Sequence, residues 1–160
     1  MLNERLNNHS MKKLVSLLIL SSVAAACFSQ EENPVKWTFS AKKIADKSYE
    51  IHLTAVIEKE WHIYSQATPD GGPVPTSISY FKNPLLVIQG EAKEMGKLEK
   101  HFEKLFDVEV MQFSEKVDFV QTVNLKTNVK TNLTGKVAFM TCNDEMCLPP
   151  KSIPFSIALK

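Results

Sequence analysis

Several features that would point to common protein classes are missing from this sequence. The 160 residues carry a formal net charge of +1, so they lack the basic excess that nucleic-acid binding requires, and no nucleic-acid partner is expected. The apolar run from Leu14 to Ala26 is too short to predict a membrane-spanning helix. No repeat of 20–50 residues is visible, which argues against solenoids and propellers. The length fits a single domain.

Cysteine is scarce, and its spacing is not that of a thioredoxin active site. Of the three cysteines, Cys142 and Cys147 are separated by four residues, whereas thioredoxins use C-x-x-C. A tight turn can bring such a pair within disulfide distance. A ring this small stabilises a fold by only roughly 2 kcal/mol, which favours a working redox pair. The alternative is a structural disulfide, which is common in exported domains.

The residues between and around this pair also bear on its chemistry. Asp144 and Glu145 oppose thiolate formation by like-charge repulsion, which suits a disulfide that is reduced by a partner's activated thiol. The alternative is that acidic residues simply favour turns. His62 could join the two cysteines at a zinc ion, but the ligand spacing of a zinc site is missing. We therefore expect neither a metal nor another cofactor.

The N-terminal residues resemble an export signal. Lys12-Lys13 precede the apolar run, and small residues follow it. Residues 1–29 are therefore interpreted as an extension and signal peptide, and residues 30–160 as the domain. Cleavage after Ser29 would release a soluble product, which we favour, whereas lipidation of Cys27 would anchor the protein to a membrane. Either route predicts a periplasmic location, where a cysteine pair can be oxidised.

Period-two alternation of apolar and polar residues dominates the domain. It predicts strands on both sides of a hairpin turn at residues 46–48, and further short strands at intervals of about ten residues predict an all-β antiparallel sandwich. Trp61 is expected in the core and His62 facing solvent. The charged stretch 91–104 is the only plausible helix, and residues 114–116 are expected to form a turn between two strands.

The cysteine segment resembles that of a known family. Cys142 and Cys147, followed by Leu148-Pro149-Pro150, are similar to the motif of the periplasmic N-terminal domain of the thiol:disulfide interchange protein DsbD. Residues 61–64 resemble the aromatic strand of that family, and residues 102–113 resemble its cap segment. The resemblance covers most of the chain after residue 30. It implies an immunoglobulin-like fold, in agreement with the strand pattern.

The resemblance also implies supporting residues around the cysteines. Tyr64 would place its hydroxyl beside the pair. An aromatic cap would cover the disulfide and open for partners, with Phe106 as the best match and Glu103 and Leu105 beside it. An equally favoured interpretation is that the aromatic residues of this loop reach the sandwich core.

We therefore predict an exported domain that relays reducing equivalents through a Cys142–Cys147 dithiol/disulfide, as a disulfide reductase or interchange component. The resembled protein also has a membrane electron-conducting segment and a thioredoxin-like domain, which these 160 residues do not contain. The expected donor is a DsbD-type membrane transporter or a thioredoxin-like protein, and the expected acceptors are oxidised exported proteins. The alternative is a non-catalytic immunoglobulin-like binding module with a structural disulfide. Exposure of the sulfur atoms separates the two hypotheses, because only a shuttle needs a reachable sulfur.

Overall fold

The computed structural model describes residues 33–69 and 71–160, so the predicted signal peptide and Cys27 lie outside the described residues. The described part contains strands and no helix, and therefore no helix long and apolar enough to cross a membrane. The strands are β1 (Val35–Ala45), β2 (Ser48–Ile57), β3 (His62–Tyr64), β4 (Ser77–Tyr80), β5 (Leu86–Glu103), β6 (Val108–Leu125), β7 (Thr131–Phe139), β8 (Thr141–Cys142) and β9 (Lys151–Leu159).

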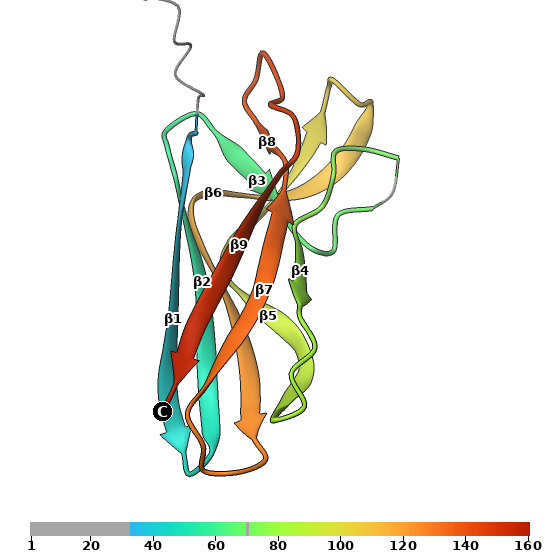
Figure 1. The fold of residues 1–160 in the computed structure, drawn as a ribbon. Coiled ribbons are helices and arrows are strands. Elements are labelled where there is room, and N and C mark those ends of the chain that lie inside the picture. Colours follow the sequence, from blue (N-terminus) through green and yellow to red (C-terminus); the bar gives the residue numbers. More distant parts are fainter. Residues whose placement is uncertain (1–32, 70) are drawn as a thin grey trace, which may run out of the picture. The chain divides into compact units, whose positions relative to one another are not determined.

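The strands form two antiparallel sheets (Figure 1). The larger sheet has the order β1-β2-β6-β3-β8, with β5 also paired to β6, and the smaller has the order β4-β7-β9. The β1–β2 hairpin turns at Asp46-Lys47, as predicted, and Lys47 has a left-handed φ of 61°. This arrangement confirms the all-β antiparallel sandwich expected from the alternating pattern.

The main core lies between the two sheets. Every second residue of β2 from Tyr49 to Ile57 is buried, as the period of two requires. Trp37 of β1 crosses the core, with its ring centroid 5.8 Å from that of Phe119 and 5.3 Å from that of Phe139 in the opposite sheet. Trp61 belongs to the same cluster, as predicted. Each large side chain buried here stabilises the fold by roughly 1.5–3 kcal/mol.

The predicted helix at residues 91–104 is wrong, because most of this stretch forms the second half of β5. Its residues pair with β6 as far as Glu103↔Val108, with register shifts near Gly90 and Gly96. A Cβ on Gly96 would lie 3.1 Å from the carbonyl oxygen of Lys116, so glycine permits the close approach of the two strands. Pairing with the long partner strand therefore overrides the helical propensity of the Glu and Lys residues in this stretch.

The predicted turn at residues 114–116 is also wrong, since β6 runs through it without interruption. Glu115 has a left-handed φ of 64° at this point. On one side of it β6 pairs with β3, up to Ser114, and on the other side with β2, from Lys116 onward. The local irregularity thus marks the place where one long strand changes partners.

Candidate functional site

The two cysteines form a disulfide across a short turn at the end of β8. Their Cα atoms lie 4.1 Å apart, and the two residues face each other as an antiparallel bridge. Asn143 shapes the turn, because its Oδ1 accepts hydrogen bonds from the backbone N–H groups of Glu145 (3.0 Å) and Met146 (2.8 Å). Such local side-chain bonds are the reason that asparagine favours turns. The turn is therefore held by its own hydrogen bonds as well as by the disulfide.

The two cysteines differ in exposure. Cys142 is fully buried, whereas Cys147 retains some solvent-exposed surface. Cys142 forms a small cluster with Tyr64 and Val110, and Val108 and Cys147 are among the residues packed against it. Val108 and Val110 come from the start of β6. The part of the β5–β6 hairpin next to its turn therefore packs on the disulfide, and Figure 1 shows this hairpin and the cysteine turn at the same end of the sandwich.

Strand β3 places its side chains directly against this cluster. His62 is the cross-strand partner of Cys142 on one side and of Ser114 on the other, and directly opposed residues share one face of a sheet. Tyr64 follows two residues later and so shares that face. His62 is only 6% exposed, so the prediction that it faces solvent is wrong. The reason is that β3 is an interior strand with neighbours on both edges.

A buried polar network joins β3 to the β5–β6 hairpin. The Tyr64 hydroxyl donates to Oε2 of Glu103 at 2.9 Å, and Nε2 of His62 lies 3.0 Å from the Tyr64 oxygen and 3.4 Å from Oε2 of Glu103. Because the Tyr64 proton is used for Glu103, its oxygen accepts from the Nε2–H of His62. Glu103 is itself 5% exposed. Sequence reasoning found Tyr64 and Glu103 but missed His62 as a member.

The ionisation behaviour of this network follows from its burial. Burial lowers the pKa of the His62 imidazole, against the opposing effect of the nearby Glu103 carboxylate. Burial, followed by the hydrogen bond to Glu103, raises the pKa of the Tyr64 phenol. Both shifts favour the neutral forms of these side chains. Next to the disulfide the protein therefore holds a neutral histidine and a neutral tyrosine bonded to a carboxylate.

The predicted cap residues lie at the tip of the β5–β6 hairpin. Residues 104–107 form its turn, in which the backbone N–H of Phe106 donates to the Glu103 carbonyl at 3.2 Å. Leu105 is 51% exposed and Phe106 is half-buried. Among the described residues of this hairpin, Val108 and Val110 are the ones that pack in the disulfide cluster. Cover of the disulfide by Phe106 therefore stays a prediction.

The acidic residues of the cysteine turn are on the surface. Asp144 and Glu145 are both exposed, and Asp144 lies close enough to His62 to affect the pKa of that imidazole. No group of three or more histidine, cysteine or acidic side chains among residues 33–69 and 71–160 is arranged to hold a metal ion.

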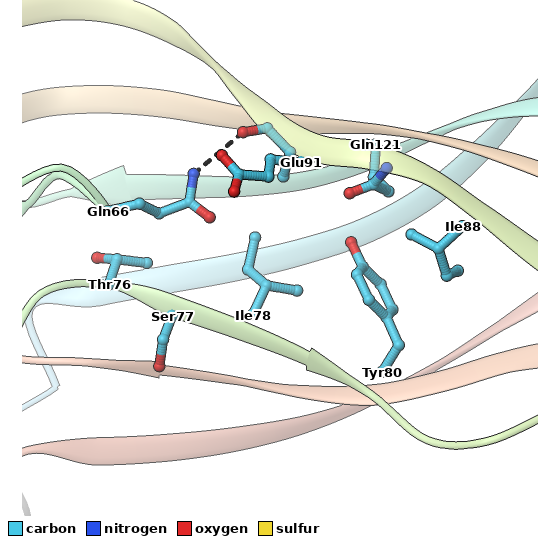
Figure 2. Close-up of a pocket in the computed structure, with 10 residues that line it drawn as sticks. Gln66, Thr76, Ser77, Ile78, Tyr80, Ile88, Glu91 and Gln121 are labelled. Atoms are coloured by element: carbon cyan, nitrogen blue, oxygen red, sulfur yellow. Dashed lines mark hydrogen bonds between the residues drawn. The ribbon is translucent and has the colours of Figure 1, made fainter.

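The largest described cavity lies elsewhere. It has a volume of about 430 Å³ and is bounded by residues of β4 and β5. Figure 2 shows Tyr80 pointing across it toward Gln121, with Ile78 and Ile88 beside it. None of the predicted site residues lines it. This cavity is therefore separate from the disulfide.

The sequence was compared with known families and structures. Residues 30–158 match the family model described as "Thiol:disulfide interchange protein DsbD, N-terminal". The chain belongs to this family. The comparison with curated proteins found no match.

Two solved structures are similar to this chain at low sequence identity. The N-terminal domain of DsbD from Neisseria meningitidis, in its reduced form, is 15% identical over 76% of this chain and 84% of its own, with a TM-score of 0.49. The N-terminal periplasmic domain of ScsB from Proteus mirabilis is 16% identical over 78% of this chain, with a TM-score of 0.48. This chain covers 44% of that ScsB chain. The fold of this family member is an immunoglobulin-like sandwich of two antiparallel sheets.

Proposed function

We propose that this protein relays reducing equivalents in the periplasm by thiol–disulfide exchange at Cys142 and Cys147. A partner thiolate attacks one sulfur, the Cys142–Cys147 bond breaks, and a mixed disulfide forms while the second sulfur leaves as a thiolate and takes up a proton. The second thiol of the partner then attacks the partner sulfur of the mixed disulfide, and the cysteine of this protein leaves as a thiol. Two electrons and two protons pass to this protein, and the partner is left oxidised. The same steps in reverse reduce an acceptor.

The observation that carries this proposal is the difference in exposure within the pair. Cys147 has exposed surface, whereas Cys142 is fully buried. An attacking thiolate needs access to a sulfur, so the incoming partner bonds to Cys147 and Cys142 is the buried leaving group. A disulfide that served only as a staple would need no such access. The location at a short surface turn supports the same reading.

The neighbouring side chains support the exchange in different ways. The network of Tyr64 with His62 and Glu103 would hold β3 and the hairpin against the buried sulfur. Asp144 and Glu145 would disfavour a free thiolate by repulsion, so that the disulfide waits for an activated thiol. Phe106 and Leu105 at the hairpin tip would shield the pair from unselective thiols. The proposed donor is a thioredoxin-like protein or a DsbD-type membrane transporter, and the proposed acceptors are oxidised exported proteins.

A trapping experiment tests the order of attack. The Cys142→Ser variant leaves the Cys147 thiol, which is first converted to a mixed disulfide with 2-nitro-5-thiobenzoate. The attacking thiolate of a thioredoxin-like protein whose resolving cysteine has been replaced should then displace thionitrobenzoate and form a mixed disulfide between the two proteins. The matched Cys147→Ser variant, treated in the same way, leaves the buried Cys142 and should form at least tenfold less of the mixed disulfide between the two proteins, as measured on non-reducing gels. Failure of both variants to trap a partner, together with a wild-type disulfide that the partner cannot reduce, would favour the non-catalytic binding module.

A further inference from the structure

A second feature of the disulfide end is a cleft beside the cysteine turn. It has a volume of about 260 Å³ and is bounded by the β2–β3 turn, the middle of β6 and the cysteine turn itself. His62, the cross-strand partner of Cys142, lies in its lining. A group bound in the cleft would therefore sit next to the disulfide without occupying it.

The lining of the cleft is strongly negative. Its lining carries the carboxylates of Glu58, Glu60, Glu115 and Asp144, against the single ammonium of Lys59, a formal charge of −3. Lys59 contacts Glu60 at 4.0 Å, and 93% of its side chain is exposed, so this pair neutralises little. The whole chain has a formal charge of +1. Negative charge is therefore concentrated beside the redox pair and not spread over the molecule.

One residue of the same lining, Gln112, has a buried hydrogen-bond acceptor without a partner. Gln112, the cross-strand neighbour of Tyr64, is only 7% exposed, and its Oε1 is buried with no hydrogen-bond partner. An unpaired buried acceptor costs free energy unless a donor reaches it. The four carboxylates call for a cation, and the unpaired Gln112 oxygen behind them lacks a donor.

We propose that this cleft binds a lysine or arginine side chain of the protein that exchanges electrons with Cys142–Cys147. The proposal deepens the proposed function, because it specifies the chemistry of the partner surface that lies next to the attacking thiol. The ammonium or guanidinium group lies among the carboxylates, and rotation of the Gln112 side chain toward the cleft lets Oε1 accept from it. This contact would hold the partner so that its attacking thiol meets Cys147, and it would favour partners with a basic surface over partners with an acidic one.

Small thiols of different charge provide the test, because they reduce a reachable disulfide whatever its biological role. The purified protein is reduced with cysteamine, 2-mercaptoethanol or mercaptoacetate in excess at low ionic strength, and the rates are measured. The diagnostic quantity is the ratio of the cysteamine rate to the mercaptoacetate rate, compared between variants so that the intrinsic reactivities of the thiols cancel. The ratio should fall about threefold in a Glu58→Gln/Glu115→Gln variant, the size expected for exposed charge pairs.

The matched control removes two negative charges elsewhere. Asp46→Asn/Glu91→Gln changes exposed residues outside the cleft and should leave the ratio unchanged. Salt at 0.5 M should remove most of the difference between the proteins. A ratio that stays constant in the cleft variant, or that falls equally in the control, overturns the proposal.

A second variant separates specific binding from general attraction. Gln112→Met removes the acceptor that would rotate into the cleft without changing charge, and it should slow cysteamine while leaving 2-mercaptoethanol unaffected. Equal effects on both thiols would show that Gln112 does not contact the cation. These outcomes are independent of the trapping experiment: a cleft without cation preference leaves the exchange function standing, and a protein that traps no partner can still show the preference.

Discussion

Strands β2 and β3 lie in the same sheet but bury their side chains for different reasons. In β2 the buried positions alternate and are apolar from Tyr49 to Ile57, so the strand is held by removal of apolar surface from water. In β3 all three residues are buried, and two of them, His62 and Tyr64, carry polar groups. Their burial is tolerable only because they bond to each other and to Glu103.

This contrast separates the apolar core of the sandwich (the body), which tolerates substitution, from the disulfide end, whose buried polar groups depend on their hydrogen-bond partners. A packed apolar core loses stability in proportion to the volume removed. A polar network loses more than one bond when one member is deleted, because the remaining groups stay buried and unpaired. The same contrast predicts that substitutions in the body change stability alone, whereas substitutions at the disulfide end also change reactivity.

The largest effect on stability is expected in the body. Phe119→Ala removes a fully buried ring that packs on Trp37 and Phe113, and it should lower the free energy of unfolding by about 3–5 kcal/mol. The rate of disulfide reduction by dithiothreitol, measured under conditions where the variant is folded, should stay near that of the wild type. A changed rate would show that the core and the redox site are coupled.

The second-largest loss of stability is expected when the central hydroxyl of the polar network, that of Tyr64, is removed. Tyr64→Phe leaves His62 and Glu103 without their shared partner, at a cost of about 1–3 kcal/mol, measured by urea unfolding. The matched control is Tyr80→Phe, because the Tyr80 hydroxyl is buried without a partner, and its removal should cost almost nothing. Similar losses in both variants would mean that the network does not stabilise the disulfide end.

Loss of the disulfide should have a smaller effect on stability and a complete effect on function. Cys147→Ser should destabilise the fold by roughly 2 kcal/mol, against a typical domain stability of about 5–15 kcal/mol. The variant should therefore be folded by circular dichroism but unable to pass electrons. An unfolded variant at room temperature would identify the disulfide as structural.

Removal of the proposed cap side chain should change the rate of disulfide reduction with little change in the free energy of unfolding. Phe106→Ala should speed reduction by dithiothreitol, because access to the sulfur limits exchange, while the free energy of unfolding falls by about 1 kcal/mol or less. The control is the nearby Phe102→Ala, whose side chain is exposed. An unchanged rate with a large loss of stability would instead place Phe106 in a packed cluster.

The smallest effect is a pH dependence that belongs to the disulfide end. Burial lowers the pKa of His62 in the folded protein, so the unfolded chain binds a proton more readily. Stability from this residue is present above about pH 6.5, the unperturbed value, and is lost as the pH falls toward the lower folded pKa. Urea unfolding between pH 7.5 and 5 should show this loss, and the His62→Gln variant should show less of it. An equal slope in both proteins would assign the pH dependence to other groups.

The sequence alone determined the parts of the molecule whose causes are local. Alternation of apolar residues predicted the two-sheet sandwich because the period of a strand is two. The spacing of Cys142 and Cys147 and the proline pair after them pointed to the closed turn and, by resemblance, to the family. Tyr64 and Glu103 were also named before any contact was known, although their direct hydrogen bond was not.

Tertiary structure alone decided the features that depend on which strands become neighbours. Residues 91–104 became strand because β6 extends far enough to pair with them, and His62 was buried because β3 acquired a neighbour on each edge. Asn143 was missed although its turn contacts are local. Gln112 was missed because an unpaired buried oxygen depends on contacts that no local pattern encodes. The difference in exposure between Cys142 and Cys147 arises in the same way, since it is set by the β5–β6 hairpin packing over one side of a short turn.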